Sequence, residues 1–379
     1  MAAMAGVALT SDLSTPVSIR IPVLDLREGG PVAHARQRRA EMLALRDACF
    51  SMAPPLRSLA GPLDRISRAW LKRSASPYAD EVARIAEIAG RPGVWFVNAS
   101  YEWGCTTRID VDPVPMLRRT LDWPFLGLGR HVEVALQDGG AGLYANVTWP
   151  GAVGVLTALA PGRFAAAINQ APMYRRIAHA AGFPIDVLLN GIGTWRRSAA
   201  WPAAHLLRRA FDSCRSYDEA VTLLIEAPLA RPTLFSIAGV EPGQGCLIER
   251  TETEARVVHG GCVIANDWHP DSSPRAGRWT PRGGLLGQAY ASERRCRALA
   301  ECEARQRFDW LTKPVLNPVT RLAVEAIPSA GLQRVVGFEP VSRGLGLGEV
   351  VPVTEPLEMV VAAHGVVRSN GFLLQGCAA

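Results

Sequence analysis

The segment Gly104-Cys105-Thr106-Thr107 holds the strongest candidate nucleophile in the chain, and Arg119 and Asp122 follow it closely. A cysteine attacks as its thiolate, and a free thiol has a pKa of about 8.5. A neighbouring cation lowers this pKa, and a neighbouring base takes the proton. Arg119 can supply the charge, and Asp122 can orient a positive group. The spacing is compatible with a strand that carries Cys105, a turn at Asp112-Pro113 and a return strand that brings Arg119 and Asp122 alongside the cysteine.

The base of such a site can be the α-amino group of the nucleophile itself. Its reference pKa of about 7.7–8.0 is closer to working pH than the value of about 10.4 for lysine. This amine exists only after the Gly104–Cys105 bond is cut, so the thiol would have to attack the preceding carbonyl and the resulting thioester would have to be hydrolysed. Spacing alone leaves a second interpretation open, because most buried cysteines are simply small apolar residues.

The elements expected around this segment change in type along the chain. Apolar residues recur at helical spacing in three early segments, 33–52, 56–73 and 76–90. Val17 to Leu26 is rich in β-branched residues and predicts a strand. Later helical blocks are expected at 201–226 and 288–312. Short strand-like runs are expected at 95–98, 106–111, 131–137, 142–149, 153–159, 164–169, 233–239, 245–250, 255–259, 261–265, 319–327 and 332–338. Strand blocks flanked by helical blocks predict layered sheets with helices outside.

Composition limits the class of protein. The 379 residues are 48% apolar and 20% charged, as in a globular chain. The formal net charge of +6 is too diffuse to predict nucleic-acid binding. No apolar run reaches the ~20 residues that cross a bilayer, and Met1 to Thr15 lacks the basic start of a signal peptide, so we expect a cytoplasmic protein. None of the eight cysteines forms a CxxC pair, and we expect free thiols in a reducing compartment.

Several ordered segments carry a resemblance to a known family. Cys105-Thr106 is followed by Arg119-x-x-Asp122. The other matching segments are Asn98 to Glu102, Asn146 to Asn169, Pro232 to Arg250, Ala265 to Trp268 and Thr312 to Asn317. Together they resemble the acid ceramidase and N-acylethanolamine acid amidase family of cysteine N-terminal-nucleophile hydrolases, which is related to bile salt hydrolase and penicillin V acylase. The resemblance covers roughly residues 17–340, and the chain beyond about residue 345 has no clear counterpart in the family.

The resemblance implies an α+β fold, a four-layer α/β/β/α sandwich with a helical N-terminal segment. Residues 1–104 would become the α-subunit after self-cleavage, and residues 105–379 would form the catalytic β-subunit of a heterodimer. The reaction would be amide hydrolysis through a thioester acyl-enzyme. No metal or organic cofactor is implied.

The resemblance also implies roles for individual residues. Cys105 is the nucleophile and the new N-terminus, Arg119 helps to keep its thiol ionised, and Asp122 engages the freed α-amine. Asn266 donates its side-chain amide to the oxyanion of the tetrahedral intermediate, a role that suits a neutral planar donor.

The family has a second arginine downstream of the oxyanion asparagine. Arg278 is the better match here and Arg275 is its rival, while an ordinary surface position for Arg278 stays open. Trp123 and Trp149 lie in segments that approach the pocket of the family. They are candidates for substrate contact, although tryptophans more often belong to the core.

The substrate implied is an N-acyl lipid, either ceramide or an N-acylethanolamine. Another acyl amide is the nearest alternative: a bile salt, a penicillin or an acyl-homoserine lactone. A catalytically inactive lipid-binding scaffold is the alternative from a different class. The apolar faces of the helices within residues 42–71 have two interpretations: they pack against the β-sheet core, or they contact a membrane surface. We favour packing against the core.

Overall fold

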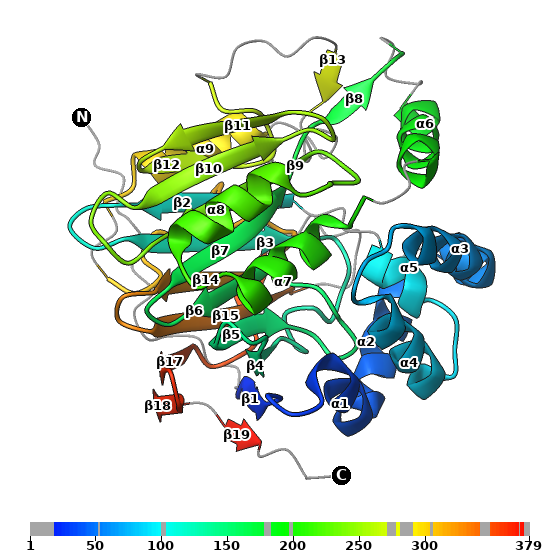
Figure 1. The fold of residues 1–379 in the computed structure, drawn as a ribbon, viewed down its shortest axis with the longest axis horizontal. Helices are drawn as coiled ribbons and strands as arrows, with labels where there is room; N and C mark the ends of the chain where they lie inside the picture. The colour runs from blue at the N-terminus through cyan, green and yellow to red at the C-terminus, as the bar shows by residue number, and fades with distance from the viewer. Residues whose placement is uncertain are drawn as a thin grey trace.

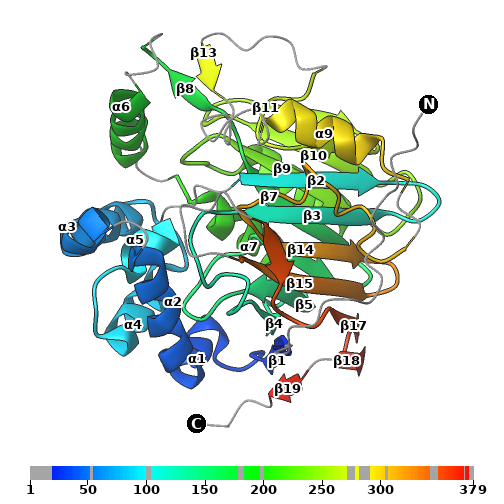
Figure 2. The ribbon, with the colours of Figure 1, turned by 180° about the vertical axis from the view of Figure 1, so that it is seen from behind.

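The computed structural model describes most of the chain. The described residues are 19–51, 54–99, 104–177, 183–196, 200–270, 278–280, 291–303, 306–341, 349–370 and 372–374. Figures 1 and 2 show the arrangement from opposite sides. Two large sheets lie at its centre, with helices outside them.

Within the described residues, the larger sheet has nine strands in the order β11-β10-β9-β7-β6-β5-β4-β1-β19. Their bounds, in that order, are Ala255–His259, Gly245–Arg250, Thr233–Ala238, Phe164–Gln170, Thr157–Ala160, Leu143–Thr148, Glu133–Asp138, Pro22–Asp25 and Phe372–Leu374. Neighbouring strands are antiparallel, except that β1 pairs in parallel with both β4 and β19. A strand from the beginning of the chain therefore lies between two strands that come after Cys105.

The described part of the second sheet has eight strands in the order β12-β2-β3-β14-β15-β17-β18, with β16 beside β15. Their bounds are Cys262–Ile264, Gly104–Asp110, Met116–Asp122, Thr320–Ile327, Leu332–Pro340, Leu357–Ala362 and Gly365–Ser369, with β16 at Val350–Pro352. The strand that carries Cys105 lies one position from the β12 edge.

Helices cover the outer faces of both sheets. α7 (Ala203–Ser213) and α8 (Tyr217–Glu226) pack on the nine-stranded sheet, and α9 (Ser292–Ala300) packs on β2 and β12 of the other sheet (Figure 2). A separate pair, β8 (Met173–Arg175) and β13 (Arg278–Thr280), lies at one end. The predicted α+β fold, a four-layer α/β/β/α sandwich, is confirmed.

The central strands are buried on both faces, which explains their composition. Every residue of β9 is buried, and so are the first six residues of β7, whose sequence FAAAIN is apolar almost throughout. A strand covered on one face alternates apolar and polar residues, whereas one covered on both faces reads as a continuous apolar run. This is the pattern expected where two sheets pack together under helices.

The chain before Cys105 is mainly helical in its described residues. The helices are α1 (Gly30–Gln37), α2 (Arg39–Ser51), α3 (Pro54–Arg73), α4 (Ala79–Ala89) and α5 (Val94–Ala99). Trp70, Ile85 and Trp95 belong to an apolar cluster that also contains Val153 and Ala230, so these helices pack against the sandwich. The three helical segments predicted for this part of the chain are confirmed.

The strand predicted at 95–98 is wrong, because these residues lie in helix α5. The Asp64 side chain accepts hydrogen bonds from the backbone N–H groups of Gly93 at 2.7 Å and Phe96 at 2.9 Å. A carboxylate that accepts these first N–H groups stabilises a helix start. Asp64 comes from α3, far earlier in the chain, so local propensity could not reveal it.

The C-terminal part of the chain, beyond about residue 345, extends both sheets. β16, β17 and β18 join the eight-stranded sheet, and β19 joins the nine-stranded one. Another helix, α6 (Phe183–Arg196), lies apart from the two large sheets, in contact with β8 and near α3 (Figure 1). Among the described residues, no helix combines the length and apolarity needed to cross a membrane.

Candidate active site

Cys105 lies near the start of the β2–β3 hairpin. Cys105 is opposite Leu121, and Thr107 is opposite Arg119. Because side chains alternate between the faces of a strand, Cys105 and Arg119 share the face toward the nine-stranded sheet. Asp122 lies on the other face, toward α9. The hairpin therefore brings the three predicted residues together from two sides of one sheet.

Arg119 holds its guanidinium against the Cys105 sulfur. Its Nη2 atom lies 3.0 Å from Sγ and donates to the carbonyl oxygen of Ile168 at 2.8 Å. Its Nη1 atom donates to the carbonyl of Leu156 at 3.0 Å and to the Thr157 hydroxyl. These contacts on the opposite sheet fix a fully buried cation beside the thiol.

The thiol is sealed from solvent in the uncut chain. Cys105 has an exposed fraction of 0%, and this burial raises the pKa of its thiol, while the positive charges of Arg119 and Arg295 act in the opposite direction. The negative charge of Asp122 adds to the rise. Burial therefore favours the protonated thiol, while the charges of Arg119 and Arg295 favour the thiolate.

Arg295 links the outer face of the hairpin to α9. Its Nη1 atom donates to the Cys105 carbonyl at 2.6 Å, to the Thr106 hydroxyl at 2.9 Å and to Asp122 Oδ2 at 3.1 Å. Asp122 Oδ1 accepts a hydrogen bond from the Thr320 hydroxyl at 2.8 Å. Asp122 is thus a buried, ion-paired side chain at the end of β3, opposite Gly104 at the start of β2.

Asn266 meets the main-chain nitrogen of Cys105. Its Oδ1 accepts the Cys105 N–H at 2.9 Å and an Arg295 N–H at 2.8 Å. Its Nδ2 donates to the carbonyl of Gln170 at 2.8 Å. The nitrogen that cleavage would turn into an α-amine is therefore already in contact with the predicted oxyanion residue.

Gly104 occupies a position with little room for a side chain. It is paired with Asp122 across the hairpin. A Cβ atom at position 104 would lie 3.1 Å from the Asp122 carbonyl oxygen and 3.3 Å from its Cβ. Both distances are tighter than ordinary contacts, so a larger residue before Cys105 would push against the strand that carries Asp122.

Arg295 was not among the predicted site residues. A weak signal exists in the sequence, because Ser292, Arg295 and Leu299 are spaced three and four apart and form the buried face of α9. An arginine on the apolar face of a helix is unusual unless it is paired. The predicted Arg278 lies on β13, where its backbone pairs with Arg175 of β8, and its side chain is outside the described part of the structure. Arg275 is outside the described residues, so both assignments stay predictions.

Trp123 and Trp149 line an apolar cavity of about 1120 Å³, a volume that includes the solvent-filled space at its entrance. It lies between helices α2 and α5 and the sandwich, and its polar lining is confined to a few side chains. The lining also includes Met42, Leu45, Cys49, Phe50, Val94, Phe96, Val97, Phe125, Leu128, Val147 and Leu156. The indole N–H of Trp149 donates to the Leu128 carbonyl at 2.7 Å, which fixes this wall.

The cavity reaches the backbone that holds Arg119. Leu156, part of the lining, supplies one of the carbonyl oxygens that bind the Arg119 guanidinium. A smaller cavity is also lined by Leu156, together with Ile168 and Gln170, whose carbonyls bind Arg119 and Asn266. Apolar space therefore lies next to the polar cluster. No group of three or more His, Cys, Asp or Glu side chains in the described residues could hold a metal ion.

Comparison with known proteins gives matches in sequence. The chain is 25% identical over 227 residues to the acid ceramidase of Bos taurus, covering 54% of this chain and 52% of the relative. It is 25% identical over 288 residues to the acid ceramidase of Heterocephalus glaber, covering 66% of this chain and 67% of the relative. No family model matches the chain. The chain is therefore similar in sequence to the acid ceramidases over half to two thirds of its length. It spans about half the length of the first of these relatives.

Two solved structures are also similar to this chain. A Caenorhabditis elegans N-acylethanolamine-hydrolysing acid amidase ortholog is 16% identical with a TM-score of 0.44, covering 65% of this chain and 99% of its own. A mutant conjugated bile acid hydrolase from Clostridium perfringens is 10% identical with a TM-score of 0.38, covering 73% of this chain and 100% of its own.

In this chain, four predicted residues form one contact network. Arg119 contacts the sulfur of Cys105, Asn266 contacts its nitrogen, and Arg295 joins Asp122 to the Cys105 carbonyl. Such an arrangement can stabilise a thiolate, receive an amine and supply an amide donor close to a reacting carbonyl. These are the groups that acyl transfer to a thiol requires.

Proposed function

We propose that the chain is a cysteine amidohydrolase that activates itself by cutting the Gly104–Cys105 bond. The observation that supports this most is that two buried polar side chains contact Cys105, one at its sulfur and one at its main-chain nitrogen. Arg119 lies 3.0 Å from the Cys105 sulfur while Asn266 accepts the Cys105 N–H at 2.9 Å. A cysteine that only fills space has no need for a buried cation and a buried amide on these two atoms.

In the activation step, the thiol of Cys105 attacks the carbonyl carbon of Gly104. The new C–S bond forms as the C–N bond breaks, and the leaving nitrogen takes the thiol proton to become an amine. Water then hydrolyses the thioester, releasing the Gly104 carboxylate and restoring the thiol. Asp122, held by Arg295 and Thr320 opposite Gly104, would balance the charge of the new amine.

In the hydrolytic cycle, the α-amine of Cys105 takes the thiol proton and the sulfur attacks the substrate carbonyl. Asn266 donates its side-chain amide to the oxyanion, and the amine leaving group takes the proton. A thioester acyl-enzyme forms, and water converts it to the free acid. Arg119 stabilises the thiolate at both the start and the end of the cycle.

The substrate is an N-acyl lipid, ceramide-like or N-acylethanolamine-like. Two features support this class: the relatives in sequence are named acid ceramidases, and the apolar cavity beside Trp123 and Trp149 can take an acyl chain. The cavity leads toward Leu156 and so toward the Arg119–Cys105 pair. An acyl chain in the cavity would lie against Leu156, whose carbonyl holds the Arg119 guanidinium.

The two fragments would stay together as a heterodimer after the cut. β1 is paired on both sides by later strands, β4 and β19. His34 Nε2 lies 2.6 Å from Glu133 Oε2, and Arg208 makes a two-point ion pair with Glu81 at 2.7 and 3.0 Å. Each cysteine that the structure describes is a free thiol, so the association of the described parts is non-covalent.

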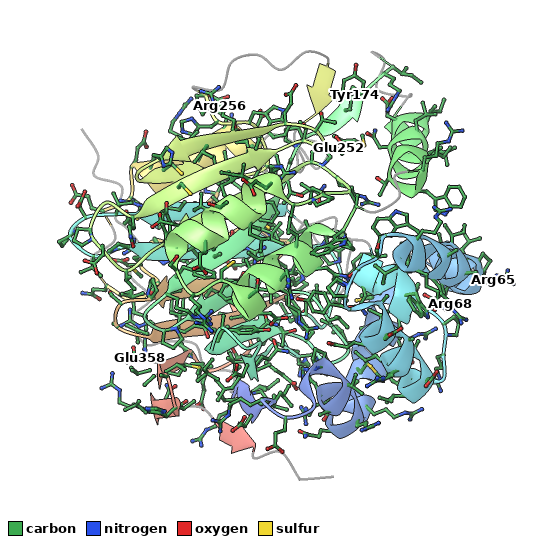
Figure 3. The ribbon with its side chains drawn as sticks, in the orientation of Figure 1. Arg65, Arg68, Tyr174, Glu252, Arg256 and Glu358 are labelled. Atoms are coloured by element: carbon green, nitrogen blue, oxygen red, sulfur yellow. The ribbon has the colours of Figure 1, made fainter. Side chains whose placement is uncertain are left out.

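Membrane-surface contact is part of the proposal. α3 and α6 meet where the Arg73 guanidinium lies 4.1 Å from the centroid of the Trp195 ring. Large apolar side chains are exposed on both helices, namely Leu59, Ile66, Ile185, Leu188 and Trp195. Arg65 and Arg68 project from α3 at the same edge of the molecule (Figure 3). Apolar and basic side chains together favour an anionic lipid surface.

A substrate panel tests the proposed activity. Ceramide, an N-acylethanolamine, a conjugated bile salt, a penicillin and an acyl-homoserine lactone would each be incubated with the processed protein, and the released acid and amine quantified. Intact-mass spectra of quenched reactions should show an acyl adduct on residues 105–379 that is absent in Cys105→Ala. Turnover of a different amide would correct the substrate, and hydrolysis of none would favour the inactive scaffold.

A further inference from the structure

A second polar pair lies between the two sheets and has no role in the steps above. Thr107 is on β2, two residues after the nucleophile, and Asn169 is near the end of β7 on the opposite sheet. The Thr107 hydroxyl donates to Asn169 Oδ1 at 2.7 Å. Both side chains are fully buried. A fully hydrogen-bonded polar pair in an otherwise apolar layer fixes the relative position of the two strands that carry it.

The other end of the Asn169 amide holds the segment that carries Asn266. Its Nδ2 donates to the carbonyls of Ile264 at 3.3 Å and Ala265 at 2.9 Å, the two residues directly before Asn266. Asn169 therefore connects the nucleophile strand, through Thr107, to the backbone of the oxyanion segment.

The connection is reciprocal. Asn266 Nδ2 donates to the carbonyl of Gln170, the residue that follows Asn169. Each asparagine therefore binds the backbone next to the other, and the pair forms a clasp between the end of β7 and the segment 264–266. Because the clasp sets the backbone of Asn266, it also sets where the Asn266 amide meets the Cys105 nitrogen.

We propose that Asn169 is a positioning residue that acts through Asn266, with Thr107 holding Asn169 in register with the nucleophile strand. The inference depends on the proposed hydrolase activity. Asn169 touches neither the sulfur nor the apolar cavity in the contacts of the described residues. Its loss should therefore slow the chemical step and leave acyl-chain binding unchanged.

The test uses Asn169→Leu, which keeps the shape and removes the donors, and Thr107→Val, which removes only the hydroxyl. Misplacing a reacting group by about 1 Å can cost up to ~10²-fold in rate, so kcat should fall by up to this factor for Asn169→Leu while KM stays near its wild-type value. Thr107→Val should lower kcat less, and Thr107→Ser should restore it. Ser236→Ala is the matched control, because this buried hydroxyl on β9 has no hydrogen-bond partner among the described residues.

A double-mutant cycle with Asn266→Ala separates positioning from general destabilisation. If Asn169 acts through Asn266, Asn169→Leu should change kcat little in the Asn266→Ala background. An equal loss of kcat in both backgrounds, or wild-type kcat in folded Asn169→Leu and Thr107→Val, overturns the inference. Should Asn169→Leu not fold, the Thr107→Val and Thr107→Ser pair decides. An inactive wild type overturns the proposed function, and the inference with it, whereas an active wild type with unaffected variants overturns the inference alone.

Discussion

At the scale of single residues, Cys105 is held through its sulfur, its nitrogen and its carbonyl oxygen by three different side chains. Arg119, Asn266 and Arg295 make these contacts from three separate elements. The sulfur contact bears on nucleophilicity, because a guanidinium favours the thiolate. The nitrogen contact bears on the proposed cleavage, because that atom would become the amine.

Arg119 gives a prediction about pH. Its charge lowers the pKa of the Cys105 thiol, against the rise caused by burial. Replacing Arg119 with Gln removes this opposing charge, so the thiol pKa should move up and the thiolate fraction at neutral pH should fall. The rate of alkylation of the processed enzyme by iodoacetamide, followed from pH 6 to 10, should show its inflection at higher pH in the variant. An unchanged or lower inflection would contradict the role assigned to Arg119.

Arg295 gives a prediction about stability. Removing one partner of a buried ion pair leaves the other charge uncompensated, which typically costs about 3–5 kcal/mol. Arg295→Met should therefore lower the free energy of unfolding of the Cys105→Ala chain by this amount. Adding Asp122→Asn should restore part of the loss, because it removes the stranded charge of Asp122. Urea unfolding of both variants checks this prediction. A double variant that is no more stable than Arg295→Met would contradict the stabilising role of the Arg295–Asp122 ion pair.

At the scale of elements, the sequence predicted the hairpin that builds the site. β2 and β3 occur where a strand, a turn near Asp112-Pro113 and a return strand were expected. Arg295 was missed because it comes from α9, 173 residues beyond Asp122, and no local pattern links the two. The wrong strand at 95–98 has a similar cause, because the Asp64 carboxylate that caps α5 lies 29 residues before Gly93. Local periodicity therefore predicted most helices and strands. It failed where a side chain from a distant element, such as Asp64 or Arg295, determines the local structure or completes the site.

The C-terminal strands are the largest feature that periodicity could not place. Ile19 pairs with Thr354, the Ile19 N–H donates to Val353, and β19 lies beside β1. Strand residues that depend on a partner more than three hundred positions away carry little local signal. These contacts hold the beginning of the chain to its end.

Removing β19 should weaken the association of the two fragments in the processed protein, whereas an unprocessed chain has no fragment to release. Ending the chain at Asn370 leaves β1 paired only with β4, so fragment 1–104 should dissociate from the processed protein at a lower urea concentration than in the full chain. The same truncation in Cys105→Ala, where the fragments stay covalently joined, is the control. Gel filtration in a urea series checks this. If the truncated and full-length proteins release the fragment at the same urea concentration, β19 does not retain it.

At the scale of the whole molecule, the part of the chain before Gly104 contributes both to the apolar cavity and to the larger sheet. It supplies one wall of the apolar cavity through α2 and α5, while Trp123, Trp149 and Leu156 supply the other. It also supplies β1 to the larger sheet. A chain cut at Gly104–Cys105 would therefore need both fragments to bind a substrate, and the buried thiol would gain its amine without losing the cavity.

The most direct measurement is the intact mass of the purified protein, with N-terminal sequencing of its fragments. The account predicts fragments 1–104 and 105–379 in the wild type, the second beginning at Cys105, after incubation across a range of pH. Cys105→Ala should stay at full length under every condition. A wild type that stays at full length throughout, or a cut that persists in Cys105→Ala, would contradict the claim that this thiol cleaves its own chain.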